Sequence, residues 1–419
     1  MSALNRRIVA DYPLVVIALL LSLYGIAMVY SAGETDVRSV AAGVWKNQVV
    51  WLALAMSVAF IASRSSVRLT EWLTPPAYLF SIALLLVTLF FGTGAGTAAS
   101  VKGWLTIAGV RLGQPAELAK VTVVLMLAKV LSANRNPPKS LLDLWRPALV
   151  VGLPWLLIMA QPDLGTGIAF IGIFFGMLFW SGVSPLLLIL VASPAVSLIL
   201  AFSSWYWAAW FCLLIGLVIL YKPYITEGVS LVMANLGIGV MAPTLWESLA
   251  PYQQHRLLVF LNPSIDIRGA GWHVIQSQVA IGSGGFFGKG FTLGSQKRLA
   301  FLPAQHTDFI FAVLGEEMGF IGVTLALALF LLLLLRTVKV AERANDSFSS
   351  LVAIGFATGW LVHIIVNVGM TLNLMPITGI PLPFFSYGGS FMLASWIAVG
   401  IILRISSEGR GGRPGTLGI

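Results

Sequence analysis

The segment from Pro251 to Asp308 combines two carboxylates with several cations. The carboxylates are Asp266 and Asp308. The basic residues are Arg256, Arg268, Lys289, Lys297 and Arg298. A carboxylate among cations suits a general base that works beside an anionic substrate, so Asp266 is the candidate base and Arg268 and Lys289 are candidate substrate ligands. The alternative is that Asp266, in the sequence NPSID, only caps a turn.

Glycine recurs between residues 282 and 290, in the sequence GSGGFFGKG. Because glycine lets the backbone approach a ligand closely, we expect Ser283 and Gly284 to bind substrate. His306 lies two positions before Asp308. This spacing predicts either an orienting pair in the same site or an interfacial polar cluster, and both residues are candidate substrate ligands.

A second irregular segment, MPITGIPLPFFSYGGS at residues 375–390, adjoins a predicted membrane span. Irregular backbone at membrane depth occurs only where it is buried in protein or lines a cavity. We therefore expect this segment to form a wall of the same site, with Ser386 as a binding residue.

Ionisable residues also lie within or beside apolar stretches, where charge is costly and is usually functional or paired. QPAELAK places Glu117 and Lys120 on one helical face, and QPDLGT places Asp163 at a turn between two spans. The alternatives to a role in the site are a local ion pair for the first two and helix capping for Asp163. We expect one of Glu316 and Glu317 to face the protein interior.

The composition requires elements that cross a membrane. Of the 419 residues, 58% are hydrophobic and only 10% are charged, with a mean hydropathy of +0.92. Soluble domains carry roughly 25% charged residues. The net charge of +9 does not indicate nucleic-acid binding, because the basic residues cluster at the ends of apolar segments. The histidines lack zinc-ligand spacing, and Cys212 is the only cysteine, so neither a histidine- or cysteine-based metal site nor a disulfide framework is predicted.

The elements that must position the candidate residues are about twelve membrane-spanning helices. The apolar runs lie near 14–32, 47–63, 76–92, 115–132, 146–160, 164–182, 186–203, 206–221, 228–245, 309–335, 351–372 and 388–404. Lysine and arginine residues are concentrated in alternate connections between these runs. This distribution predicts that both termini lie in the cytoplasm. The segment 246–308 then lies on the outer face.

Five sequence blocks together resemble the SEDS family (shape, elongation, division and sporulation). They are GWLTIAGVRLGQPAELAK (103–120), QPDLGTG (161–167), NPSIDIRGAGWHVIQSQVAIGSGGFFGKG (262–290), LPAQHTDFIFAVLGEEMGFIG (302–322) and GIPLPFFSYGGS (379–390). The blocks occur in the order typical of the family, and the resemblance covers nearly the whole chain. The amino-acid sequence of the third block is more similar to that of elongation-type members than to that of division-type members.

The resemblance implies a peptidoglycan glycosyltransferase that polymerises lipid II at the outer face of the bacterial cytoplasmic membrane, for cell elongation and shape. It implies a class B penicillin-binding protein and other elongation-complex membrane proteins as partners. The essential loop aspartate of the family corresponds to Asp266. Its conserved glutamate and lysine correspond to Glu117 and Lys120, and its QPDLGT aspartate corresponds to Asp163.

This chemistry needs only one carboxylate, because a sugar pyrophosphate leaves as a stabilised anion without a general acid. Asp266 would take the proton of the acceptor 4-hydroxyl. Lys120 and the loop cations would hold the pyrophosphate, with a divalent cation such as Mg²⁺ or Mn²⁺ as an optional addition. No organic cofactor is expected.

The chain departs from the family pattern at four places. Ala116 stands where serine is usual, Ala304 where glutamate is usual, and Phe391 where a small residue is usual. The fourth departure is a pair of additional apolar runs, because family members typically have ten spans. The predicted organisation is a transmembrane block (1–203), an inserted hairpin (204–245), an extracytoplasmic catalytic loop (246–308), a second transmembrane block (309–404) and a disordered cytoplasmic tail (405–419).

Three alternatives stay open. The protein could flip lipid II across the membrane without forming a bond, because many spans and intramembrane charges also fit a transporter. It could act as a scaffold that only positions the penicillin-binding protein. It could also be a division-type member of the same family.

Overall fold

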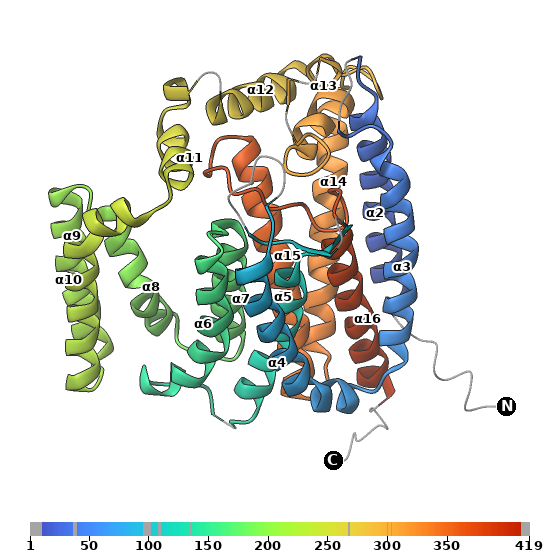
Figure 1. Ribbon diagram of the computed structural model, residues 1–419. Coiled ribbons are helices and arrows are strands. Elements are labelled where there is room, and N and C mark those ends of the chain that lie inside the picture. The colour runs from blue at the N-terminus through green and yellow to red at the C-terminus, as the bar shows by residue number, and fades with distance from the viewer. Residues whose placement is uncertain are drawn as a thin grey trace.

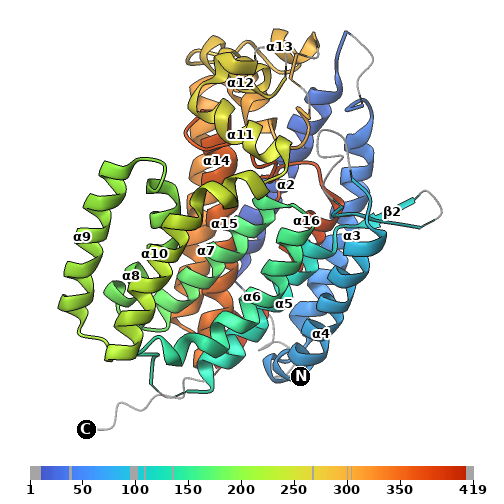
Figure 2. The ribbon, with the colours of Figure 1, turned by 60° about the vertical axis from the view of Figure 1, so that its left-hand side comes forward.

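The computed structural model describes residues 11–36, 40–94, 102–107, 110–134, 136–266, 269–299, 301–302 and 304–411. Long helices run side by side through its body, and shorter helices cover one end (Figures 1 and 2). The long helices are α2 (Tyr12–Gly33), α3 (Val44–Arg64), α4 (Val67–Phe91), α5 (Pro115–Ser132), α6 (Trp145–Ala160), α7 (Leu164–Trp180), α8 (Pro185–Leu200), α9 (Ser204–Tyr221), α10 (Ile225–Ser248), α14 (Ile310–Glu342), α15 (Ser347–Thr371) and α16 (Gly389–Gly411).

The connecting segments contain the remaining elements. These are β1 (Leu105–Ile107), β2 (Val110–Gly113), η1 (Leu142–Leu144), α11 (Pro251–Leu261), η2 (Pro263–Asp266), α12 (Ala270–Ser283) and α13 (Ser295–Arg298). The two short strands pair antiparallel. The segment after residue 248, predicted as a loop, is therefore largely helical, because α12 buries one face (Val274, Ser277 and Ala280) against the bundle.

The predicted membrane fold is confirmed. Within the described residues, nine helices are long and apolar enough to cross a membrane. Each predicted apolar run coincides with one long helix, although α5 carries three charged residues and α7 and α8 have only 17 and 16 residues. Helices are favoured because lipid offers no partner for backbone N–H and C=O groups.

Helix α15 lies at the centre of the bundle, where it packs against α5, α7 and α14. Helices α8, α9 and α10 form a group at one side (Figure 2), and α9 and α10 both pack on α8. Inside this group Asn235 accepts a hydrogen bond from Ser197 at 2.6 Å and donates one to Ser193 at 2.8 Å. Helices α9 and α10 occupy the expected position of the extra hairpin, and its origin as an insertion stays a prediction.

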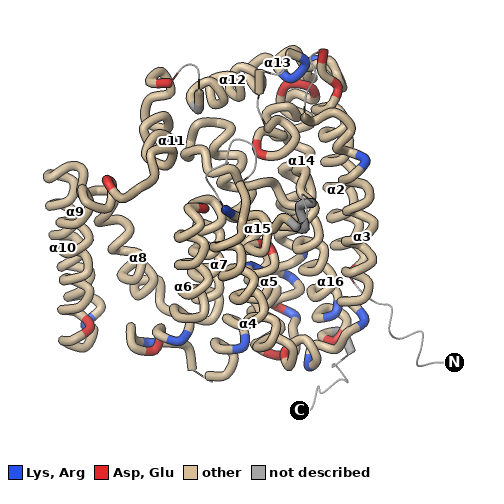
Figure 3. Tube along the Cα trace, viewed as in Figure 1, with Lys and Arg blue, Asp and Glu red and all other residues tan. Residues whose placement is uncertain are grey.

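Charge is distributed unequally between the two ends of the bundle. Many lysine and arginine positions gather at the end where α2 begins and α16 ends, opposite α11, α12 and α13 (Figure 3). This separation is the pattern on which the topology prediction depends. The assignment of that end to the cytoplasm stays a prediction.

Candidate active site between the connecting helices and the bundle

Asp266 ends the short helix η2, between α11 and α12. Its Oδ2 atom lies 3.4 Å from Nε2 of His255 on α11, and the Asp266 side chain is 22% exposed. A Cβ atom on Gly269 would lie 2.1 Å from the same Oδ2, so glycine there allows the carboxylate to pack against the backbone. In the preceding turn the side chain of Asn262 accepts a hydrogen bond from the Ser264 N–H at 3.1 Å. Asp266 is thus accessible and lies beside an imidazole.

Arg256 acts electrostatically on His273, which also senses the charge of Asp266, and on Asp308. Its guanidinium carbon lies 5.5 Å from the centre of the Tyr252 ring. Burial raises the pKa of Asp308 to about 6, and the positive charge of Arg256 opposes this rise. Burial lowers the pKa of His273, whereas the charge of Asp266 raises it and that of Arg256 lowers it. Asp266, His273, Arg256 and Asp308 therefore belong to one electrostatic group.

Asp163 extends the group toward the membrane-spanning helices. As the N-cap of α7 it accepts hydrogen bonds from the Thr166 N–H at 3.0 Å and the Thr166 hydroxyl at 2.8 Å. It also accepts one from Nε2 of Gln114 at 3.3 Å. Its charge raises the pKa of Asp308, and it lies within electrostatic reach of Glu117. Asp163 therefore caps a helix and also lies between the group around Asp308 and the side chain of Glu117.

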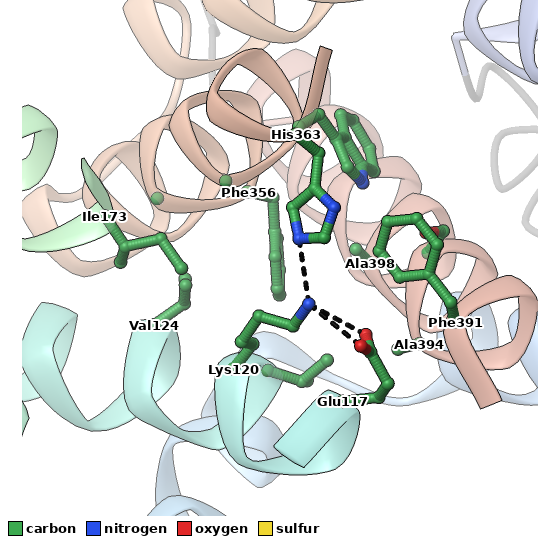
Figure 4. Close-up of a pocket in the computed structure, with 14 residues that line it drawn as sticks. Glu117, Lys120, Val124, Ile173, Phe356, His363, Phe391, Ala394 and Ala398 are labelled. Atoms are coloured by element: carbon green, nitrogen blue, oxygen red, sulfur yellow. Dashed lines mark hydrogen bonds and ion pairs between the residues drawn. The ribbon is translucent and has the colours of Figure 1, made fainter. Parts of the chain in front are cut away.

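Glu117 and Lys120 point into the bundle, where Nζ of Lys120 lies 2.9 Å from Oε2 of Glu117 (Figure 4). The same Nζ lies 2.8 Å from Nε2 of His363 on α15. These side chains border a small cavity of about 40 Å³ together with Phe391 and Ser395. The local ion pair expected as the alternative for Glu117 and Lys120 is present, and it contacts a third polar residue.

His363 was not a candidate from the sequence. A polar residue within the apolar run of α15 was the available signal, since such residues usually have a partner or a function. In the sequence Arg256 is one of several loop cations, and no pattern there marks it as a ligand. No local pattern identifies His255 and His273, because their proximity to Asp266 depends on how α11 and α12 fold.

The structure does not bring Ser283, Gly284 and Lys289 together with Asp266. Ser283 donates its hydroxyl hydrogen to the Ala280 carbonyl at 2.9 Å. A Cβ atom on Gly284 would lie 2.0 Å from the Gly315 carbonyl oxygen, so this glycine brings the backbone close to α14 rather than to a ligand. The expected ligand cradle is therefore a packing surface for α14.

Lys289 has protein partners in the same region. Its Nζ lies 2.7 Å from Oε1 of Glu316 and 2.7 Å from the Ser295 hydroxyl. Nearby, Nζ of Lys297 lies 2.7 Å from Oε1 of Glu317. Both glutamates are buried, so the expectation that only one faces the interior was too narrow.

His306 and Ser386 lie in two segments that pack on each other. Ser386 donates its hydroxyl hydrogen to the Thr307 carbonyl at 2.7 Å, and the Tyr387 N–H donates to the His306 carbonyl at 3.0 Å. Burial lowers the pKa of His306. A Cβ atom on Gly379 would lie 3.3 Å from Oδ2 of Asp308, so the irregular segment 375–390 forms a wall beside that carboxylate.

Two further predictions concern Arg268 and a divalent metal ion. Arg268 lies outside the described residues. Within the described ranges, no group of three or more His, Cys, Asp or Glu side chains is arranged to hold a metal ion.

The chain matches the family model FTSW_RODA_SPOVE, described as cell cycle protein, over residues 12–210 and 206–411. It is 34% identical to the peptidoglycan glycosyltransferase RodA of Treponema pallidum, with 95% of this chain and 98% of the relative covered. It is 33% identical to the peptidoglycan glycosyltransferase MrdB of Escherichia coli, with 95% and 94% covered. Identity to the probable peptidoglycan glycosyltransferase FtsW of Geobacter metallireducens is 32%, with 97% and 98% covered.

Solved structures give the same result. A chain from a study of how a peptidoglycan synthase complex coordinates polymerization and crosslinking superposes with a TM-score of 0.70 at 27% identity, covering 96% of this chain and 99% of that chain. The Rod shape determining protein RodA of Thermus thermophilus superposes with a TM-score of 0.61 at 26% identity, covering 95% and 97%. The resemblance predicted from the five sequence blocks is confirmed, and the chain is a multi-pass membrane protein that belongs to the FtsW, RodA and SpoVE family of cell cycle proteins.

Proposed function

We propose that the protein is a peptidoglycan glycosyltransferase that polymerises lipid II into glycan strands for cell elongation and shape. Its relatives RodA and MrdB are named peptidoglycan glycosyltransferases, and they are 34% and 33% identical to it over almost the whole chain. The observation that carries the proposal is the accessible Asp266 carboxylate, which lies in one electrostatic group with Arg256 at one end of a membrane bundle.

The proposed reaction uses Asp266 as the general base. The 4-hydroxyl oxygen of the acceptor attacks the anomeric carbon of the donor, and Asp266 takes the hydroxyl proton. The bond between that carbon and the pyrophosphate oxygen breaks, and its electron pair leaves with polyprenyl pyrophosphate. The displacement inverts the α-linkage of the donor and forms the β-1,4 bond.

The departing pyrophosphate needs positive charge. Arg256 is the described cation best placed to supply it, because it lies within reach of both His273 and Asp308. Lys289 already forms an ion pair with Glu316, and Lys120 already contacts Glu117 and His363. The described residues do not fit a metal site, so a Mg²⁺ or Mn²⁺ ion enters the proposal only as a companion of the substrate pyrophosphate.

The proposed setting is the bacterial cytoplasmic membrane, with both termini in the cytoplasm and the Asp266 end on the outer face. The structural similarity to a chain of a peptidoglycan synthase complex supports a class B penicillin-binding protein as partner. Other elongation-complex membrane proteins are further proposed partners. The apolar surfaces between membrane helices would accommodate the polyprenyl tails.

One observation favours a lipid II flippase as the second candidate. The cluster of Glu117, Lys120 and His363 lies within the helix bundle, where transporters commonly bind their substrates. Bond formation discriminates the two functions, because a flippase moves lipid II without consuming it.

The test incubates purified protein and labelled lipid II, with and without the penicillin-binding partner, and compares the wild type with Asp266→Ala. Loss of the base should lower polymer formation by ~100-fold or more. The matched control is Asp36→Ala, which removes an exposed carboxylate paired with Arg298 at 2.8 Å and should leave polymerisation unchanged. Equal polymer from wild type and Asp266→Ala would refute the base. No polymer from the folded wild type with its partner would favour the flippase, which is then tested in liposomes.

A further inference from the structure

The ammonium group of Lys120 lies against three different side chains. Glu117 lies at 2.9 Å and Nε2 of His363 at 2.8 Å. The ring centre of Phe391 lies at 4.9 Å, within the range of a cation–π contact. Figure 4 shows the three side chains converging on Nζ from α5, α15 and α16. The position of Lys120 therefore depends on three helices.

The hydrogen bonds of His363 determine which ring nitrogen carries its proton. Nδ1 lies 2.9 Å from the carbonyl oxygen of Pro381, which can only accept. Nδ1 therefore donates, and Nε2 presents its lone pair to Nζ of Lys120. A doubly protonated ring would direct an N–H at the ammonium, so the imidazole is neutral in this arrangement. His363 thus accepts from Lys120 while it binds the backbone of the segment 375–390.

Phe391 completes the arrangement. Its ring stacks on the His363 ring with centres 4.5 Å apart and an angle of 24° between the planes. Phe391 occupies the position where the sequence resemblance leads us to expect a small residue. The large ring holds the imidazole in place and covers the third side of the ammonium.

The same helix α5 connects this cluster with the rest of the site. Gln114, the N-cap of α5, donates its side-chain amide to Asp163 at 3.3 Å and its backbone N–H to the Ser390 hydroxyl at 3.1 Å. Asp163 in turn acts electrostatically on Asp308. A change in how α5 packs on α15 would therefore reach both carboxylates.

We propose that His363 is a positioning residue for glycosyl transfer: as a neutral acceptor stacked on Phe391, it holds Lys120 and thereby fixes α5 against the segment 375–390. The inference rests on the proposed function and adds a residue that acts through Lys120. A displacement of about 1 Å near reacting groups can lower a rate by ~100-fold. Loss of the acceptor should accordingly lower the turnover rate more than it changes KM for lipid II.

The experiment measures polymer formation per folded molecule and the unfolding temperature in detergent, for full-length variants with the penicillin-binding partner. His363→Leu removes the acceptor and should lower turnover by about tenfold or more. His363→Gln keeps an acceptor and should recover much of the rate. Ser350→Ala is the matched control, because it removes a hydrogen bond from Trp180 at 2.9 Å elsewhere on α15. It should leave the rate per folded molecule unchanged.

A double-mutant cycle with Lys120→Met separates positioning from a general effect on the fold. If His363 acts through Lys120, His363→Leu should add little in the Lys120→Met background, in rate and in unfolding temperature. Additive losses, or no recovery of the rate in His363→Gln, would overturn the inference. The proposed glycosyltransferase function would still stand. An inactive folded wild type would overturn the proposed function and the catalytic part of the inference. The coupling in unfolding temperature would still test the contact itself.

Discussion

Among the residues that the structure describes, two lysine–glutamate pairs are buried in the bundle, and their surroundings differ. Lys297 is 0% exposed, and its Nζ contacts Glu317 at 2.7 Å and the carbonyl and hydroxyl oxygens of Ser31 at 2.6 Å each. Lys120 contacts Glu117, an imidazole and an aromatic face, and it borders a cavity. Oxygen atoms take up the whole donor capacity of Lys297, which indicates a structural role. Lys120 instead has an imidazole and an aromatic ring among its neighbours and borders a cavity, as expected of a group coupled to function.

The glycine-rich segment belongs to the structural region around Lys297. Helix α14 has a non-helical residue at Gly319, with φ 59°. The segment fits around this kink, where the N–H groups of Lys289 and Gly290 donate to the carbonyls of Glu316 and Glu317 at 3.0 Å each. The backbone and the two ion pairs together join α14 to α2 and α13. This region therefore supports the site without contributing a ligand to it.

The largest effect on stability is expected from Lys297→Met, which would leave Glu317 without its cation. Breaking a buried ion pair on one side costs about 3–5 kcal/mol. The unfolding temperature in detergent should fall strongly, and the second substitution Glu317→Leu should restore much of it. A single variant as stable as the wild type would place Lys297 outside the structural region.

Glycine substitutions test the segment around the kink with a smaller effect. A Cβ atom on Gly288 would lie 2.1 Å from the Glu317 carbonyl oxygen, whereas on Gly285 it would meet open space. Both residues have a positive φ, at +81° and +58°. Gly285→Ala should therefore cost only the roughly 1–2 kcal/mol of a left-handed backbone, and Gly288→Ala clearly more. Equal unfolding temperatures for the two variants would contradict the close packing.

A third effect, on the pH dependence of stability, concerns the candidate active site. Because burial raises the pKa of Asp308 to about 6, the folded protein retains a proton that the unfolded chain releases near pH ~4. The stability of the wild type should therefore fall as pH rises from about 4 to about 6 and then level off. Asp308→Asn does not titrate, so its unfolding temperature should rise relative to the wild type over this interval. A constant difference between pH 4 and pH 8 would contradict the burial of Asp308.

Hydropathy predicted the long helices well, because each must satisfy its own backbone in lipid. Asp266 was identifiable as one of two carboxylates among many cations. The role of Gly284 was not, because close backbone approach serves a helix or a ligand equally well. His363 was missed because its partner Lys120 lies 243 positions away in the sequence. Local patterns therefore predicted elements and isolated charges, whereas contacts between distant elements required the fold.

The most direct test compares Asp266→Asn with Lys297→Met, both purified in the same way. It measures the glycan polymer formed per folded molecule and the unfolding temperature of each variant. The account predicts that Asp266→Asn unfolds like the wild type and forms almost no polymer. It predicts that Lys297→Met unfolds at a much lower temperature, while its folded fraction polymerises lipid II at the wild-type rate. Normal polymerisation by Asp266→Asn, or an inactive but stable Lys297→Met, would contradict the division between a reacting and a structural region.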